Sequence, residues 1–363
     1  MMPLSDADDA ARTVAVVGGQ YGSEGKGAVV ARIAGRFATH VRVGAANAGH
    51  TFYTSDGVKR TCQQLPCAAY AHPAATLVLG PGALISADIL TDEIARNRRW
   101  RAARALPPAD ILLDFRAHII QPQHIAREAA GDLGERIGSA SARAREGIGE
   151  AQADRVLRSA DSVPASCAEI PLPAEVTVCD TVRALRQRSA EGLLEGTQGA
   201  GLSLITGDYP YVTSRDTTAS GLCADAGVPA RQLDEVIMVC RTFPIRVAGA
   251  SGPFWDGSQE ISWKDIGVDP DLERTTVTGL IRRVATFSVD QVAYAAHLNG
   301  ATQIALTFCD YLDRRLAGCD GHAADHRSGR VRRVVEEIEQ ATGVPVTYLG
   351  TGPRTGLTGT LAG

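Results

Sequence analysis

The chain has 363 residues, of which 44% are hydrophobic and 21% are charged, and its formal net charge is −4. This is the balance of a water-soluble globular protein that is long enough for one large core or two domains. The mildly negative charge excludes a general attraction to nucleic acid, and no apolar run is long enough for a membrane span. We therefore expect neither a nucleic acid nor a membrane as a partner.

Short apolar segments rich in β-forming residues recur along the chain, at 13–17, 40–43, 76–80, 110–115, 191–196, 235–240, 302–308 and 345–350. Amphipathic helical patterns lie between several of them, at 27–37, 87–100, 288–300 and 331–343. This alternation predicts an α/β protein with a mostly parallel central sheet flanked by helices. In such folds, chemistry collects in the loops at the carboxyl ends of the strands.

Two segments interrupt the alternation and are expected to be inserted loops. Residues 131–165 contain "GSASARAREGIGE", which is typical of a mobile loop before a helix, and residues 248–281 are rich in Gly and Thr. We find no internal repeat and no linker, so we expect a single domain over residues 13–363. The acidic residues 1–12 do not resemble a signal peptide, and we expect them to form a flexible tail.

Eight cysteines follow no CxxC or CxxH spacing, so a zinc site is not expected. Reduced thiols predict a cytoplasmic protein, in the host cytoplasm if the gene belongs to a phage. The basic run "RNRRWRAAR" (96–104) has the spacing of a solvated helix face and is not read as a nucleic-acid site.

The most informative motif is "GGQYGSEGKG" (18–27), which lies between a predicted strand and a predicted helix. Backbone N–H groups at a helix N-terminus form an anion site, and Lys26 adds a positive charge, so the motif favours phosphate binding over a purely structural turn. It is not a Walker A loop, because Gly27 stands where a Ser or Thr would bind magnesium.

Three further segments carry polar side chains near strand ends. "GAANAGHT" (44–51) places a carboxamide and an imidazole three residues apart, and the His could donate a proton or be structural. "LEGTQGAGLSLITGDYPYVTSRDTTASG" (194–221) offers many hydroxyl groups suited to a phosphate. "ERTTVTGLIRR" (273–283) could close over a carboxylate or be a solvated loop.

Taken together, these motifs resemble those of the adenylosuccinate synthetase family, whose fold is related to the P-loop NTPases. The family motifs GDEGKG, GHNAGHT, EGAQG, YPYVTSSNTTAGG, ATTGRRRR, TKLD and STGPDR are matched in order by "GSEGKG", "GAANAGHT", "EGTQG", "YPYVTSRDTTASG", "TVTGLIRR", "TFCD" and "GTGPRT", between residues 13 and 356. The family joins aspartate to a purine 6-oxo nucleotide, driven by a nucleoside triphosphate. The 6-oxygen first takes the γ-phosphate, and the aspartate amine then displaces phosphate from C6.

The resemblance implies roles for particular residues. The residues implied in catalysis are Ser23, Lys26, His50 and Gln198. The residues implied at the donor nucleotide are Gly22, Glu24, Gly25, Lys26, Gly27, Gly49, His50, Thr51, Asp310, Gly350, Thr351, Gly352 and Pro353. Those implied at the acceptor nucleotide are Ser23, Asn47, Ser139 or Ser141, Arg158, Gln198, Thr213 and Arg246. Those implied at the aspartate substrate are Thr276, Val277, Thr278 and Arg282.

The resemblance also implies Mg²⁺ as a cofactor, with Ser23 and the carbonyl of Gly49 as protein ligands. It implies a homodimer in which Arg158 reaches the nucleotide of the neighbouring subunit.

The departures from the family pattern are informative. Ser23 replaces a catalytic aspartate, Leu280 replaces an arginine near the ribose hydroxyl, and Phe308 replaces the lysine of TKLD. The chain also lacks a stretch after Asp313 that the longer enzymes contain. These features resemble the short phage branch, which acts on dGMP with ATP or dATP and makes N6-succino-2-amino-2′-deoxyadenylate, a precursor of 2-aminoadenine (diaminopurine) DNA.

Two alternatives remain open at the level of sequence. One is an IMP-dependent adenylosuccinate synthetase with an altered loop. The other is a non-catalytic nucleotide-binding homologue that lost its base when Ser23 arose. The preferred phosphate donor, whether ATP, dATP or GTP, is also left open.

Overall fold

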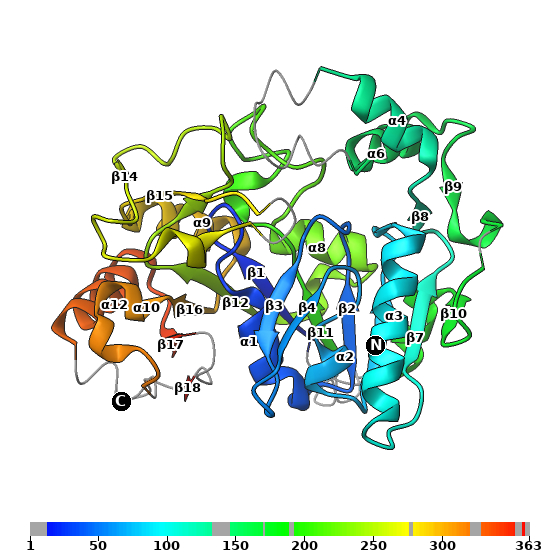
Figure 1. Ribbon diagram of the computed structural model, residues 1–363, viewed down its shortest axis with the longest axis horizontal. Coiled ribbons are helices and arrows are strands. Elements are labelled where there is room, and N and C mark those ends of the chain that lie inside the picture. The colour runs from blue at the N-terminus through cyan, green and yellow to red at the C-terminus, as the bar shows by residue number, and fades with distance from the viewer. Residues whose placement is uncertain are drawn as a thin grey trace, which may run out of the picture.

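A ten-stranded sheet runs through the molecule (Figure 1). The computed structural model describes residues 13–132, 146–169, 171–188, 192–275, 279–319, 328–352 and 358–359. The strands, in their order across the sheet, are β10 (Val176–Cys179), β7 (Asp110–Asp114), β5 (Thr76–Leu79), β2 (Thr39–Arg42), β11 (Gly192–Glu195), β1 (Thr13–Gly18), β12 (Leu233–Arg241), β16 (Gln303–Thr307), β17 (Val346–Leu349) and β18 (Thr358–Gly359).

Neighbouring strands pair in parallel from β10 to β17, and β18 pairs with β17 in the antiparallel sense. All eight segments predicted as strands lie in this one sheet, so the mostly parallel α/β architecture is confirmed. A parallel sheet is covered on both faces, which is why its strands read as near-continuous apolar runs in the sequence.

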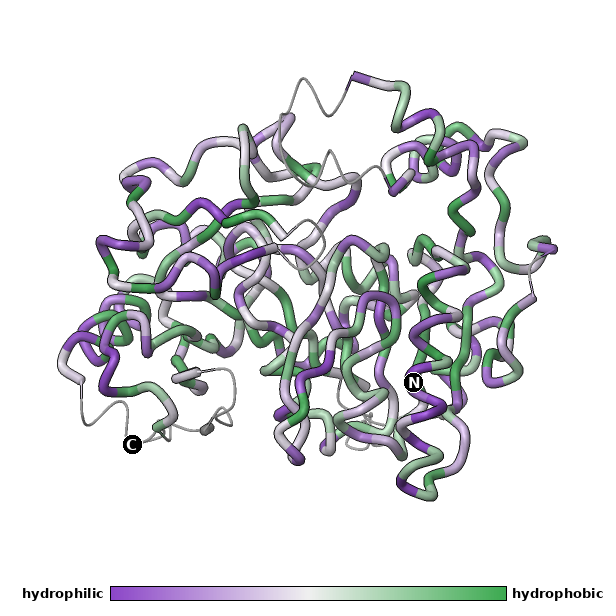
Figure 2. The backbone as a smooth tube through the Cα atoms, in the orientation of Figure 1, coloured by the Kyte–Doolittle hydropathy of each residue, from purple (hydrophilic) through white to green (hydrophobic). Residues whose placement is uncertain are grey.

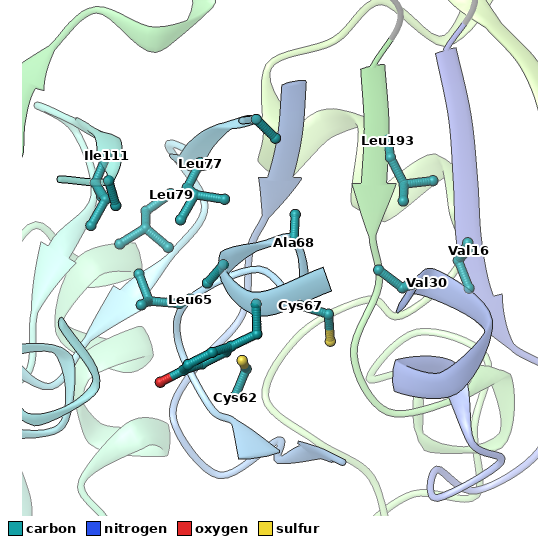
Figure 3. Close-up of a cluster of buried hydrophobic side chains, with 14 of the residues drawn as sticks. Val16, Val30, Cys62, Leu65, Cys67, Ala68, Leu77, Leu79, Ile111 and Leu193 are labelled. Atoms are coloured by element: carbon teal, nitrogen blue, oxygen red, sulfur yellow. The ribbon is translucent and has the colours of Figure 1, made fainter. Parts of the chain in front are cut away.

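Helices cover both faces of the sheet, and the alternation of β1 shows how. Val14 and Val16 belong to the core shared with α1 (Lys26–Ile33), α2 (Ala68–Ala71) and α3 (Ala87–Ala102). Ala15 and Val17 belong to the opposite core, which includes α8 (Ala219–Ala226), α9 (Val289–Asn299) and α12 (Gly329–Thr342). Figure 2 shows the central strands mainly in hydrophobic green, and Figure 3 shows part of the first core.

The predicted helices are confirmed in α1, α3, α9 and α12, which differ from the expected bounds by only a few residues. The other short elements are η1 (Ala34–Arg36), β3 (His50–Tyr53), β4 (Lys59–Cys62), β6 (Leu84–Ile85), β8 (His118–Ile119), α4 (Pro122–Ala130), α6 (Ile148–Leu157), β9 (Val163–Pro164), η2 (Ala165–Cys167), α7 (Thr181–Arg188), η3 (Ala200–Leu202), η4 (Ala230–Gln232), β13 (Ile245–Arg246), β14 (Glu260–Ile261), η5 (Pro270–Glu273), β15 (Arg283–Ala285), α10 (Cys309–Leu312) and η6 (Arg314–Leu316).

The two inserted segments differ from each other. Residues 248–281 are largely irregular where they are described, with only β14 and η5 in regular structure. The other segment contains α6, which lies beside α4 beyond β8 (Figure 1). The tail 1–12 and the loop 133–145 lie outside the described residues.

Three simpler expectations can be compared with the structure. All eight cysteines are free thiols. Among the described helices, none combines the length and the apolar character that a bilayer crossing requires. The basic run on α3 is only partly solvated, because Arg101 is buried and donates to the carbonyls of Pro107 and Pro73.

Candidate active site

The loop between β1 and α1 is held in shape by its own glutamate. Backbone φ is positive at Gly22, Ser23 and Gly25, which turns the chain tightly at the carboxyl end of β1. The Glu24 carboxylate is fully buried and accepts hydrogen bonds from the backbone N–H groups of Gln20 (3.2 Å) and Gly22 (2.7 Å). This carboxylate therefore braces the loop from inside, a role that the sequence motif did not indicate.

Lys26 completes this arrangement at the start of α1. Its ammonium group lies 2.6 Å from the Glu24 carboxylate and also donates to the backbone carbonyl of Gln198. The loop after β1 is thereby tied to the loop after β11. A buried cation at a helix N-terminus, surrounded by backbone N–H groups, is a suitable site for phosphate oxygens.

The packing around Gly27 leaves no room for the Ser or Thr that a Walker A loop has at this position. A Cβ atom there would lie 3.0 Å from the Thr51 carbonyl oxygen and 3.1 Å from the His50 Cβ. Helix α1 therefore packs directly against β3, and this contact brings His50 next to the phosphate loop. The Thr51 hydroxyl lies 3.1 Å from that of Thr61 on the neighbouring strand β4.

The imidazole of His50 is held in place by the buried ion pair of Arg42 and Glu195. Its Nδ1 atom lies 2.5 Å from Glu195 Oε1 and 3.1 Å from Arg42 Nη1, and Arg42 also donates to Glu195. The second carboxylate oxygen of Glu195 accepts the N–H of Cys67 at 2.8 Å. Burial lowers the pKa of His50 to about 4, with the Arg42 charge adding to the effect, so the imidazole is neutral at pH 7.

This cluster has metal-ligand chemistry but is better described as a structural anchor. Within the described residues, His50, Cys67 and Glu195 are the group whose ligand atoms lie close enough to share an ion, within 4.8 Å of one another. The guanidinium of Arg42 already neutralises Glu195, and burial raises the pKa of the Cys67 thiol, so the thiolate that a metal would bind is disfavoured. The Arg42 charge holds the pKa of Glu195 low.

A second buried network lies on the other side of the phosphate loop. Arg241, at the end of β12, donates to the Ser23 carbonyl at 3.3 Å and to Glu273 at 2.9 Å. Glu273 also accepts from Tyr311 (2.8 Å) and pairs with Arg282 at 3.3 Å. The backbone at Ser23 is thus connected to Arg282, the arginine that the sequence assigns to the aspartate substrate. The Ser23 side chain itself is exposed.

The segment after β16, which is predicted to face the donor base, combines an aromatic ring at Phe308 with a buried carboxyl group at Asp310. Phe308 has a positive φ of 58°, and the Arg241 guanidinium stacks on its ring at 3.9 Å from the centroid. Asp310 Oδ1 is buried and has no hydrogen-bond partner among the described residues, and burial raises the pKa of this carboxyl group. Gly350 pairs with this segment through the N–H of Cys309.

Thr351 is one of the residues that the family resemblance places at the donor nucleotide. Its hydroxyl donates to the Cys319 carbonyl, so this group is turned toward the protein. Gly352 has a φ of 145°.

A cavity of about 630 Å³ opens beside these loops. Its walls come from the ends of β2, β5 and β11, from α6 and α8, and from the loop that follows η3. The lining includes Asn47, Gln198, Thr213, Arg155, Arg215 and Asp225. Gln198 has a φ of 56°, and its amide nitrogen lies 3.4 Å from the Asn47 carboxamide oxygen. Such a cavity has the size of a small-molecule site.

The structure thus brings together Lys26, His50, Asn47, Gln198 and Thr213 around the phosphate loop and the adjoining cavity. Arg246 is buried and holds backbone carbonyls and Asp208, while its guanidinium stacks on Tyr21. Arg158 is exposed at the end of α6. Gly49 lies directly before β3 and is described, whereas Ser139, Ser141, Thr276, Val277, Thr278 and Pro353 lie outside the described residues.

The sequence analysis did not identify the buried residues whose hydrogen bonds position His50 and the backbone of the phosphate loop. Arg42 and Glu195 stand inside apolar strands, where a charged residue is unusual, and that was the available signal. Arg241 follows the apolar run of β12 in the same way. Their partners are distant in the chain, so no local pattern could have identified the pairs.

The family model for adenylosuccinate synthetase matches residues 15–167 and 161–328 of this chain. The adenylosuccinate synthetase of Thermococcus onnurineus is 36% identical over 346 residues, covering 93% of this chain and 95% of that protein. The adenylosuccinate synthetase of Methanocaldococcus jannaschii is 35% identical over 345 residues, covering 93% and 94%.

Two solved structures are similar throughout their length. Succinoaminodeoxyadenylate synthetase (PurZ) of cyanophage S-2L, bound to dGMP and to dATP as an energy donor, has a TM-score of 0.81 and 32% identity, covering 97% of this chain and 96% of that one. The fully ligated adenylosuccinate synthetase of Plasmodium falciparum has a TM-score of 0.77 at 20% identity, covering 96% and 99%, and this likeness concerns the fold alone.

Proposed function

We propose that this chain, which belongs to the adenylosuccinate synthetase family and is a C–N bond-forming ligase of that type, uses dGMP as its acceptor. In this proposal it joins L-aspartate to C6 of dGMP with ATP or dATP as the phosphate donor. The product is N6-succino-2-amino-2′-deoxyadenylate. The observation that carries the proposal is the serine at position 23, in the middle of the phosphate loop.

The backbone at Ser23 does not itself require a serine. Its φ of 57° lies in the left-handed region, where Asn and Asp are enriched and Ser is not. Aspartate, which resemblance to the family leads us to expect here, would suit this backbone better. We infer that the side chain was selected for what it meets and not for local conformation.

A guanine acceptor supplies a reason for this choice. The 2-amino group of guanine lies next to N1, where a carboxylate would be crowded by it. Serine is shorter and neutral, and its hydroxyl can accept a hydrogen bond from that amine. The Ser23 side chain is exposed and is available for this contact within the described part of the chain, where Arg241 bonds its backbone carbonyl.

The proposed chemistry needs two bond exchanges. In the first, N1 of the purine releases its proton to solvent, the 6-oxygen bonds to the γ-phosphorus, and the nucleoside diphosphate leaves with the bridging oxygen. In the second, the aspartate nitrogen bonds to C6, phosphate leaves with the former 6-oxygen, and the amine loses a proton. Catalysis of such steps is mostly positioning and charge stabilisation.

The described residues can supply these functions. Lys26 and the loop N–H groups would hold the transferring phosphoryl group, and Gln198 would hold the purine. His50 is neutral when the site is empty, since burial lowers its pKa to about 4. The anionic phosphates of a bound donor would favour its protonated form, which is the form that donates a hydrogen bond to an oxygen gaining charge. Arg282 would bind a carboxylate of aspartate.

Mg²⁺ fits this site only as a partner of the substrate phosphates. The expected protein ligands, the Ser23 hydroxyl and the Gly49 carbonyl, are neutral oxygens, and the nearby Glu24 carboxylate is engaged by Lys26 and two N–H groups. Mg²⁺ commonly binds through a few protein oxygens and the phosphates of a nucleotide. The ion would neutralise charge on the transferring group.

Leu280 is consistent with a deoxynucleotide acceptor. Its side chain is 46% exposed, in the loop that also carries Arg282. An apolar residue there offers no hydrogen bond to a 2′-hydroxyl, so a nucleotide without that group loses nothing.

An IMP-dependent reaction is the second candidate, and the archaeal relatives that carry the name adenylosuccinate synthetase favour it. The test is phosphate release from enzyme, Mg²⁺, ATP and aspartate with either dGMP or IMP. Our proposal expects release with dGMP that depends on aspartate. Release with IMP alone would establish the second candidate, and no release with either would favour a non-catalytic homologue.

A further inference from the structure

Arg215 occupies a position in the cavity that the sequence motifs did not single out. It belongs to a loop that is folded back on itself, because the Arg215 carbonyl accepts the N–H of Leu204 at 2.9 Å. The next residue, Asp216, accepts from the hydroxyls of Ser203 and Thr218, both at 2.7 Å. The loop therefore presents Arg215 from a fixed backbone.

The Arg215 guanidinium is enclosed but only partly satisfied. One nitrogen, Nη2, pairs with Asp225 of α8. The other two, Nε and Nη1, are buried and have no hydrogen-bond partner within the described residues, and the side chain is 14% exposed. Leaving buried donors of a charged group unpaired is costly, so such groups are normally bonded to something.

The position of this group follows from its contact with Gly44. A Cβ atom on Gly44 would lie 2.7 Å from Arg215 Nη1, so the guanidinium lies directly over the chain where β2 ends. Strand β2 is two strands from β1, whose end carries the phosphate loop. With strands about 4.8 Å apart, this separation is roughly 10 Å across the sheet. An acceptor nucleotide with its purine at the phosphate loop would place its own phosphate at a similar distance.

Two arginines and two aspartates line this part of the cavity, and each aspartate already has a partner. Arg155 of α6 lines the same cavity and donates to the Pro81 carbonyl at 3.1 Å. Asp225 faces both arginines, and Asp216 is occupied by its hydroxyl partners. Burial lowers the pKa of both arginines, and a dianion between them would offset this desolvation. Thr213 lines the same cavity.

We propose that Arg215 binds the 5′-phosphate of the acceptor nucleotide from within the same subunit, through the unpartnered Nε and Nη1. The inference rests on the proposed function only in taking the ligand of this cavity to be a nucleoside monophosphate. An arginine fork matches two phosphate oxygens, which a serine in the family motif could not do. Asp225 orients the fork through Nη2 and competes with the phosphate for its charge.

The experiment compares each nucleotide with the nucleoside that lacks the phosphate. Binding of dGMP, deoxyguanosine, IMP and inosine to the full chain is measured by titration calorimetry, for wild type and for Arg215→Gln, Arg215→Lys and Asp225→Asn. We expect Arg215→Gln to weaken monophosphate binding by about 10- to 100-fold, and nucleoside binding by less than twofold. Arg215→Lys should fall between wild type and Arg215→Gln, because it keeps the charge but not the fork.

The Asp225→Asn variant distinguishes two roles of Arg215, namely binding of the phosphate and a purely structural ion pair with Asp225. If Arg215 binds phosphate, this variant holds the monophosphate as tightly as wild type or more tightly. If the ion pair is only structural, Asp225→Asn and Arg215→Gln weaken nucleotide and nucleoside alike, and the inference is overturned.

The choice of acceptor is tested separately. If wild type binds IMP and not dGMP, the proposed acceptor is wrong, but the ratio of IMP to inosine affinity still tests Arg215. If wild type binds neither monophosphate, both proposals fail.

Discussion

The phosphate-loop side and the acceptor cavity differ in how their charges are satisfied. On the loop side, Lys26 has Glu24, Arg42 has Glu195, and Arg241 has Glu273. In the cavity, Arg215 keeps two buried nitrogens without partners among the described residues, and the Gln198 amide nitrogen lies at a long distance of 3.4 Å from the Asn47 carboxamide oxygen. Each of these loop-side cations therefore already has a carboxylate partner, although Arg241 Nε and Asp310 Oδ1 have no hydrogen-bond partner within the described residues. In the cavity, by comparison, the Arg215 guanidinium still offers two donors.

This difference separates two tasks. Phosphoryl transfer needs groups that are fixed before the reaction, because reorganisation during charge transfer raises the barrier. Recognition of one acceptor needs groups that are satisfied only by that acceptor, because an analogue then leaves them unpaired. The loop side suits the first task and the cavity the second.

The largest effect is expected on the loop side. Lys26→Ala should lower turnover by about 10²–10³, because it removes a fixed positive charge from the transferring phosphoryl group. His50→Ala should behave similarly. Steady-state phosphate release measures both, and thermal unfolding checks that the fold is kept.

Lys59 is the matched control, because it is an exposed lysine on β4. Lys59→Ala should leave turnover unchanged. Near-normal activity in both the Lys26 and the His50 variants would refute the assignment of the site.

Buried neutral histidines should make the fold sensitive to acid. Burial lowers the pKa of His40, behind η1, to about 4, from 6.5. The unfolded chain binds a proton at this residue below pH 6.5, while the folded chain does not until pH 4, so stability falls as the pH is lowered through this window. The loss is at most about 3 kcal/mol for this residue.

Urea unfolding at a series of pH values measures this dependence. His40→Gln should flatten the slope between pH 6.5 and pH 4. His50 titrates in the same window and keeps part of the slope, so a slope unchanged by His40→Gln would show that His40 is not one of the buried neutral groups.

The cavity side is proposed to be completed by a second subunit as well as by the acceptor. Val156 and Leu157 are 64% and 75% exposed at the end of α6, next to the exposed Arg158. We propose a homodimer that covers these side chains and carries Arg158 to the partner's acceptor phosphate. Arg158→Ala should then weaken acceptor binding by about tenfold without dissociating the dimer.

Leu157→Asp should dissociate this dimer, because it places a charge in an apolar contact. Light scattering at assay concentration gives the oligomeric state. A wild-type enzyme that is active as a monomer would contradict the proposal.

A smaller effect is expected for the choice of donor. Phe308 replaces a lysine of the family motif and is held against Arg241, while Asp310 keeps an unpartnered oxygen within the described part of the chain. We predict a preference for ATP or dATP over GTP of about tenfold, equivalent to about 1.4 kcal/mol. Competition assays with the three donors measure it, and a preference for GTP over both would overturn the prediction.

The sequence was sufficient for the sheet but not for all of the site. Most residues of the eight predicted strands are buried, which produces apolar runs that a sequence pattern can detect. β10 was missed because it lies at the sheet edge, where its side chains are exposed or half-buried. The motifs located the loops after β1, β2 and β11, since parallel strands bring their carboxyl ends together.

The pairs Arg241–Glu273 and Arg215–Asp225 were not predictable in the same way. Each joins side chains that only the folded chain brings together. Glu24 was expected at the donor nucleotide, but its carboxylate faces inward and braces the loop, because the motif specifies the residue and not the direction of its side chain. Burial and long-range pairing, and not residue type, decide these roles.

The central claim is that Ser23 adapts the phosphate loop to a guanine acceptor. The most direct test is the ratio of kcat/KM for dGMP to kcat/KM for IMP, measured for wild type and for Ser23→Asp. Our account predicts that wild type favours dGMP and that Ser23→Asp lowers the ratio by reducing dGMP use, with some gain in IMP use. A wild type that prefers IMP, or a Ser23→Asp enzyme that turns over dGMP faster, would contradict it.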